Sequence, residues 1–349
     1  MNPASSPGRH RLVHPAVHAL FQRRFEGDDA LLRLARLRFV QAGLAAEVYA
    51  DTPEQLDHVL GFTPPPGHLP TVHLNRTVNL LHAPDRRLVQ DYAVRFSGRV
   101  SGLVVHDQRD MATRIPELMR GLRELDAQLA AATSPPYVFL EYAAGLDPDL
   151  FIDIARRMAE IERVSVCIDV GHVGIRQSRV HFRERHPDLD LAALHPGDRR
   201  LQSLAAEVQE ATASALPAVL EMTHALARID KRVHFHLHDG HPVIPGLSDH
   251  FSFLTQVAVP FDHEGRRSLD PMFGPSGLAA IVSAAIDSFG AERASLTLEI
   301  HQTEGRLPLG DAASLFRHWR DLTNAERMNY GLSVLAQNNM LLSSSVEFR

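Results

Sequence analysis

Cysteine is almost absent from the chain: the 349-residue sequence contains one, Cys167. No intrachain disulfide can form, which suits a reducing compartment such as the cytosol. Cys167 stands inside an apolar run, where we expect a small core residue. The opening residues lack the apolar segment of a signal peptide, and no run of about 18 apolar residues follows. The sequence therefore predicts a cytoplasmic protein without a membrane segment.

An excess of positive charge is also absent. The 36 basic and 42 acidic residues give a net charge of -6. A protein that binds nucleic acid or an anionic membrane over a broad surface needs the opposite sign, so both are disfavoured as partners. A small-molecule substrate is compatible with this charge. The sequence leaves the oligomeric state open, with a homo-oligomer among the outcomes.

No glycine-rich phosphate loop follows the first expected strand, which disfavours a doubly wound open sheet. Apolar runs instead alternate with amphipathic segments along the chain, and Thr52-Pro53 and Asp147-Pro148 mark two helix starts. The expected strands are 11–17, 44–50, 71–75, 102–107, 137–143, 164–170, 233–239 and 295–301. The expected helices are 28–41, 53–60, 84–96, 115–131, 148–162, 201–229, 276–288 and 311–322. This alternation predicts an α/β fold, a (β/α)₈ TIM barrel.

Two connections are longer than a minimal barrel needs. They follow strands six and seven, at about 174–230 and 241–275. Because both follow strands with ligand-type residues, we expect them to overhang the site as lids or partner-binding elements. A tail at about 325–349 is expected to begin as a helix and fray at LLSSSVEFR. The sequence thus predicts one barrel domain over residues 1–349.

Ligand-type side chains end six successive expected strands. A β-branched apolar run normally ends in a turn residue, and the carboxyl ends of parallel barrel strands meet at one rim. Carboxylates crowded at that rim are costly unless a cation neutralises them. The residues concerned are His73, His106, Glu141, Asp169, His172, His236, Asp239 and Glu299.

The set contains carboxylates and imidazoles but no thiolate, which favours Mn²⁺, Zn²⁺ or Fe²⁺. Glu141, Asp169, His236 and Glu299 come from four strands and are predicted to surround one divalent ion. His73 and His106 are predicted to bind a second ion or a substrate oxygen, and His172 reaches the same rim. Asp239 is expected to ligate metal or to accept a hydrogen bond from an imidazole.

Neighbouring polar residues are expected to serve the substrate or the core. His234, His236 and His238 alternate along one strand and so share a face. His238 is predicted to contact substrate, whereas His234 lies deeper and is expected to be a hydrogen-bonded core residue. Arg176 and Lys231 are candidates for orienting a hydroxyl or phosphate group.

Several motifs resemble those of the xylose-isomerase-like TIM barrels, the group that contains endonuclease IV and the sugar phosphate isomerases and epimerases. They are FLEYAAG at 139–145, CIDVGH at 167–172, HLHDGH at 236–241 and TLEIH at 297–301, with HLNRTVNL at 73–80 and VVHD at 104–107. The resemblance covers about residues 71–301. It implies metal ligation by Glu141, Asp169, His236 and Glu299, with Glu141 and Glu299 exchanging a substrate proton and His172 contacting substrate.

The resemblance to endonuclease IV implies a three-zinc cluster completed by His73, His106, His172 and an Asp-x-His pair after strand seven. Here the nearest pairs, Asp249-His250 and Asp262-His263, lack the intervening residue. Asp249 is therefore a candidate ligand for an additional ion.

The resemblance implies a metal-dependent sugar isomerase or epimerase, and so a carbohydrate-like substrate, as the first hypothesis. Proton transfer by Glu141 and Glu299 at a metal-bound carbonyl is its chemistry. The alternatives are a multi-zinc phosphodiester hydrolase and a metal-dependent enzyme that acts on a specialised metabolite. One Mn²⁺ per chain would favour the first, about three zinc ions the second, and iron the third.

Overall fold

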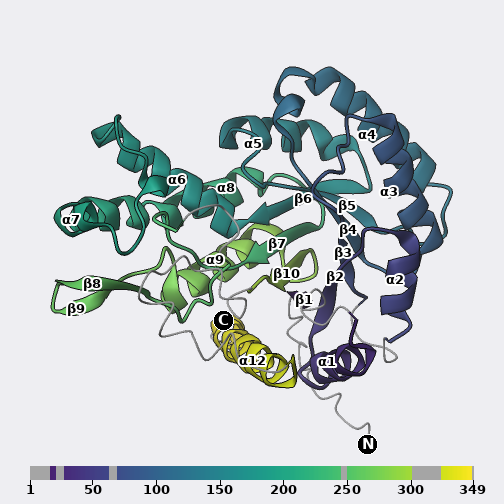
Figure 1. Ribbon diagram of the computed structural model, residues 1–349. Helices are drawn as coiled ribbons and strands as arrows, with labels where there is room; N and C mark the ends of the chain where they lie inside the picture. Colours follow the sequence, from purple (N-terminus) through teal and green to yellow (C-terminus); the bar gives the residue numbers. More distant parts are fainter. Residues whose placement is uncertain (1–15, 21–26, 63–68, 245–249, 301–323, 348–349) are drawn as a thin grey trace, which may run out of the picture.

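Parallel strands close into a barrel at the centre of the protein (Figure 1). The computed structural model describes residues 16–20, 27–62, 69–244, 250–300 and 324–347. Around the barrel the order is β1-β10-β7-β6-β5-β4-β3-β2, and every neighbouring pair is parallel. The strands are β1 (Ala16–Leu20), β2 (Ala45–Tyr49), β3 (Thr71–His73), β4 (Gly102–His106), β5 (Tyr137–Glu141), β6 (Val164–Asp169), β7 (Val233–Leu237) and β10 (Ala294–Leu298).

The prediction of an α/β fold with a parallel barrel is confirmed. The last expected helix, 311–322, and residues 11–15 of the first expected strand lie outside the described residues. The eightfold strand–helix repeat and the single-domain organisation therefore stay predictions.

Helices surround the barrel and join its strands (Figure 1). Proline in the first turn and a capping side chain fix two of the starts: Thr52 accepts from the Gln55 amide, and Asp147 from the Asp149 amide. The helices are α1 (Asp29–Gln41), α2 (Pro53–Leu60), α3 (Ala83–Arg95), α4 (Ile115–Leu129), α5 (Pro148–Arg157), α6 (Val170–Arg185), α7 (Arg199–Ala213), α8 (Ala215–Leu226), α9 (Gly274–Phe289) and α12 (Asn324–Glu347). Short 3₁₀ turns lie at Arg109–Thr113, Met158–Glu160 and Leu191–Ala193.

Two helix predictions are wrong. The expected helix 201–229 is two helices, α7 and α8, that meet at Ser214. Pro217 explains the break, because a proline ring clashes with the carbonyl four residues earlier and has no amide to donate. The tail does not fray at 341, since α12 continues to Glu347.

The two long connections carry structure of their own. Apolar side chains of α6, α7 and an antiparallel hairpin, β8 (Val257–His263) and β9 (Arg266–Leu269), form a second core. In Figure 1, α7 and the hairpin extend from the same side of the barrel. The hairpin was not predicted, because its strands are short and half exposed. No described helix has both the length and the apolar character needed to cross a membrane.

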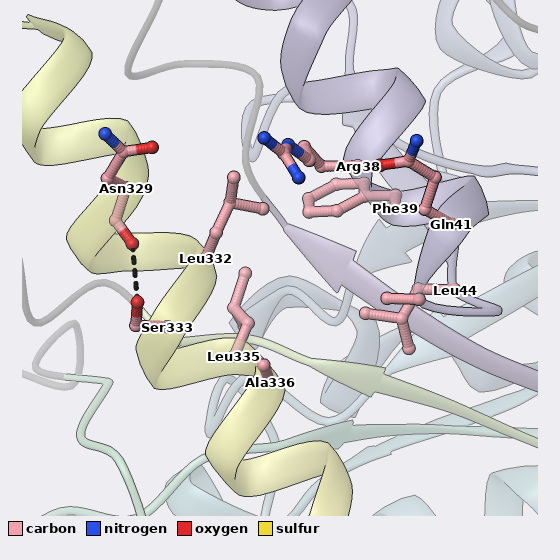
Figure 2. A pocket seen from close by; sticks show the side chains of 10 residues that line it. Arg38, Phe39, Gln41, Leu44, Asn329, Leu332, Ser333, Leu335 and Ala336 are labelled. Carbon is pink, nitrogen blue, oxygen red and sulfur yellow. Dashed lines mark hydrogen bonds between the residues drawn. The ribbon is translucent and has the colours of Figure 1, made fainter.

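The C-terminal helix α12 packs beside α1 and against β10. Figure 2 shows Leu332 and Leu335 of α12 facing Phe39 of α1 across a pocket of about 570 Å³. The polar side chains of Arg38 and Gln41 also line it. None of the predicted site residues does.

Candidate metal centre

The register of the barrel brings acids and imidazoles from different strands to one level. His106 of β4 is paired with Glu141 of β5, and Asp169 of β6 is paired with His236 of β7. Because side chains alternate across a strand, Val104, Phe139 and Cys167 lie in the barrel interior below His106, Glu141 and Asp169. The interior at that depth also holds buried polar residues, which are Glu47, Thr71, His234 and Thr297.

One group of converging residues, here called the central cluster, is built on Glu141. His73 Nε2 lies 3.2 Å and His106 Nε2 3.3 Å from its Oε2. His236 Nδ1 lies 3.4 Å from its Oε1 and 3.1 Å from Oε2 of Glu299. The Tyr49 hydroxyl donates to the other oxygen of Glu299 at 3.3 Å. The central cluster thus comprises His73, His106, Glu141, His236 and Glu299.

The hydrogen bonds of His73 fix how its ring can be used. Its Nδ1 lies 3.0 Å from the Leu74 carbonyl oxygen, which can only accept, so Nδ1 carries the proton. In the neutral imidazole, Nε2 then presents a lone pair toward the carboxylate of Glu141. A lone pair and a carboxylate oxygen at 3.2 Å attract each other only through a cation between them, either a proton or a metal ion.

The charges of the central cluster are mutually dependent. Burial alone would raise the pKa of Glu141, yet His106, His236 and His73 hold that pKa well below its ordinary range. Burial alone would lower the pKa of His236, yet the surrounding carboxylates raise it well above its ordinary value. The acids therefore stay ionised beside protonated imidazoles, and a divalent ion can take the place of those protons.

A second group, here called the rim cluster, is built on Asp169. This residue caps α6: its Oδ1 accepts the His172 amide at 2.8 Å and lies 2.9 Å from His238 Nε2. His172 Nδ1 lies 3.4 Å from its Oδ2. His250, from the long connection after β7, places its ring centroid 4.0 Å from that of His238. The rim cluster comprises Asp169, His172, His238 and His250.

The two clusters are contiguous. Glu141, Asp169 and His236 offer atoms within 4.8 Å of one another, and His250 Nε2 lies 3.5 Å from Glu299 Oε2. Within each cluster, three or four ligand atoms also lie within 4.8 Å of one another. These buried groups could hold a metal ion.

Unsatisfied buried atoms test whether the site fits a metal. Oε2 of Glu141, Oδ2 of Asp169 and Nδ1 of His236 have no hydrogen bond of acceptable geometry among the described residues. A buried carboxylate oxygen without a donor is costly. Since the orphaned atoms are all hard or borderline ligands that face each other, the donor set fits a divalent Zn²⁺, Fe²⁺ or Mn²⁺ ion.

Most of the predicted site residues lie in the two clusters, and three lie elsewhere or act differently. Arg176 is on α6, where it donates to Asp147 at 3.0 Å and lines a pocket of about 600 Å³ between α5, α6 and α8. His238, predicted to contact substrate, is fully buried, and its Nδ1 and Nε2 lie 2.9 Å from the Asp239 carbonyl oxygen and from Asp169 Oδ1. Asp249 lies outside the described residues.

The carboxylate of Asp239 accepts hydrogen bonds from the backbone and not from an imidazole in the described residues. Its donors are the amides of Gly240, Phe273 and Gly274, which ties the end of β7 to the start of α9. Lys231, the other candidate for substrate orientation, donates to the backbone carbonyls of Met158, Ile161 and Val164. His234 is the buried, hydrogen-bonded core residue that the sequence predicted.

Sequence reasoning missed Glu47, Tyr49 and His250. Glu47 and Tyr49 alternate on β2 and point to the same face, so a carboxylate inside the apolar run LAAEVYA was the available signal. The available signal for His250 was the Asp249-His250 pair, of which only Asp249 was predicted as a ligand. An antiparallel bridge between Asp239 and Phe251 returns its segment to the end of β7.

Comparison with known proteins leaves the family open: no family model and no curated protein matches the chain. Two carboxyl transferase domain structures of Rhizobium etli pyruvate carboxylase, solved with pyruvate and with 3-bromopyruvate, are similar over 96% and 95% of this chain. Their TM-scores are 0.39 and 0.40, at 11% and 12% identity, and this chain spans about half of their length, 49% and 48%. The match to an amidohydrolase structure from Burkholderia multivorans covers 90% of this chain and 93% of the amidohydrolase chain, with a TM-score of 0.38 and 14% identity. Likenesses this distant carry no weight for function.

Proposed function

We propose that this chain is a metal-dependent hydrolase whose barrel mouth binds at least two divalent ions. The observation that carries the proposal is the contiguity of the central and rim clusters through Glu141, Asp169 and His236. A single-ion enzyme needs neither His73 and His106 at one end nor His250 at the other. Neighbouring divalent ions supply water activation and electrophilic stabilisation of an anionic ester, the chemistry typical of phosphoester hydrolysis.

The protein residues have distinct roles in this proposal. Glu141 and Asp169 would hold the ions as carboxylates, since nearby imidazoles hold the pKa of each carboxyl below its ordinary value despite burial. The Tyr49 hydroxyl keeps its proton, since burial and nearby acids raise its pKa well above the usual range, and it fixes Glu299. His73 presents Nε2 to an ion and donates from Nδ1 to a carbonyl, the usual arrangement of a ligating histidine.

A sugar isomerase or epimerase is the second candidate. One observation favours it: Glu141 and Glu299 approach the same atom, His236 Nδ1, from two strands, as two proton-transfer groups around one ion would. Against it, an enzyme with one ion does not need the additional candidate ligands of the rim cluster. Membership of the xylose-isomerase-like group, implied by the motifs, is compatible with either candidate.

Metal analysis combined with two activity assays tests the proposal. We expect two or more ions of zinc, iron or manganese per chain and chelator-sensitive hydrolysis of bis-p-nitrophenyl phosphate. Asp169→Asn should lower the metal content, and Arg176→Gln, outside both clusters, should leave it unchanged. One ion per chain with interconversion of ketoses would favour the isomerase instead. A chain that binds no metal would refute both.

A further inference from the structure

A buried carboxylate below the central cluster has no place in the proposed chemistry. Glu47 of β2 is fully buried, and its Oε1 lies 2.9 Å from Nε2 of His236. The opposite ring nitrogen of His236, Nδ1, faces Glu141 and Glu299. The imidazole of His236 therefore stands between Glu47 on one side and the candidate metal ligands on the other.

The other oxygen of Glu47 is held by hydrogen-bond donors. Its Oε2 accepts from the Thr71 hydroxyl at 2.7 Å and the Thr297 hydroxyl at 3.0 Å, and lies 2.9 Å from His234 Nε2. Because a carboxylate oxygen can only accept, Nε2 of His234 carries the proton of this contact, and Nδ1 lies 2.6 Å from the Ser295 hydroxyl. Three donors from three strands therefore fix the position of the Glu47 carboxylate.

We propose that Glu47 is the positioning residue of the metal centre: it fixes the ring of His236 with Nε2–H toward Oε1 and Nδ1 toward the ion. This inference rests on the proposed metal-binding function. A carboxylate behind a ligating imidazole selects its tautomer and makes the ring a stronger ligand. Retaining a buried negative charge here, rather than a neutral residue of the same size, is otherwise costly.

Positioning and direct ligation are the two roles open to Glu47. Its Oε2 is engaged by Thr71, Thr297 and His234, whereas Glu47, His73 and His236 also offer ligand atoms within 4.8 Å of one another. Loss of Glu47 as a ligand would remove an ion. Loss of Glu47 as a positioning residue would weaken binding but keep the number of ions.

The test measures binding of Co²⁺ to metal-stripped full-length protein by chelator competition and by the visible spectrum of the bound ion. Wild type, Glu47→Gln and Thr297→Val are compared. Thr297→Val removes one hydrogen bond to Glu47 but leaves the contact between Glu47 and His236 in place. We expect Glu47→Gln to bind the same number of ions about 10–100-fold more weakly, with a shifted visible band. We expect Thr297→Val to stay within about 3-fold of wild type.

Two results would overturn the inference. Glu47→Gln could match wild type in affinity and spectrum, or it could lose an ion outright, as a ligand variant would. If Glu47→Gln fails to fold, Glu47→Asp retains the charge but withdraws it from His236, and the same weakening is expected. A wild-type chain that binds no Co²⁺ would instead refute the proposed function, so the two failures are distinguishable.

Discussion

Gly171 is the position where a single methyl group should disturb the rim cluster most. A Cβ atom at Gly171 would lie 1.8 Å from Cε1 and 2.3 Å from Nε2 of His238. The ring cannot move without loss, because its Nδ1 is bonded to the Asp239 carbonyl and its Nε2 to Asp169, each at 2.9 Å. We therefore expect Gly171→Ala to break at least one of these bonds.

The magnitude follows from two costs and one gain. Overpacking a buried site costs about 1–3 kcal/mol, and losing a hydrogen bond to a charged group costs about 1.5–3 kcal/mol. Alanine in place of glycine favours the helix by up to about 1 kcal/mol. We expect Gly171→Ala to lower the free energy of unfolding by about 3 kcal/mol, measured by urea denaturation of the metal-free protein.

Two further variants make this prediction refutable. Gly240→Ala is the matched control, since its Cβ would meet flexible side-chain ends of Met272 and Ile175 at 3.2 and 3.3 Å. In a His238→Ala background the ring is gone, and Gly171→Ala should cost less than about 1 kcal/mol. Equal costs of Gly171→Ala in both backgrounds would show that the clash with His238 is not the cause.

Two other predictions concern pH and the C-terminal helix. Burial alone would lower the pKa of His238, but Asp169 raises it from 6.5 to about 9. The stabilisation by protonated His238 is therefore fully present below pH 6.5 and is lost as the pH rises through 9, by at most about 3 kcal/mol in metal-free protein. Urea denaturation across this pH range should show a decline in the free energy of unfolding, and His238→Gln should make that decline smaller. A decline of the same size in His238→Gln would contradict the assignment. Asn338 of α12 is fully buried and forms hydrogen bonds with the segment just after His250. We expect Asn338→Ala to lower the free energy of unfolding by about 2 kcal/mol and to weaken metal binding. Asn329 is exposed on the same helix, and Asn329→Ala should have neither effect.

The strand ends were predictable because their signal is local. A β-branched run that stops at Glu141, Asp169 or His236 shows an apolar strand and a ligand side by side in the sequence. Parallel strands in a barrel share one rim, so the convergence of these groups followed from the predicted fold. The α/β barrel and most of the two clusters could be inferred in this way.

Tertiary structure decided the rest, because the remaining roles depend on contacts between residues far apart in the chain. His238 was predicted to contact substrate, and only the folded chain places its ring between Asp169 and the Asp239 carbonyl. Arg176 follows the CIDVGH motif closely, yet the turn of α6 directs it outward to Asp147. Glu47 lies within an apolar strand near the start of the chain. Only closure of the barrel places it beneath His236, which follows 189 positions later (236 − 47). Sequence fixes which side chains a strand can present; packing fixes what each of them faces.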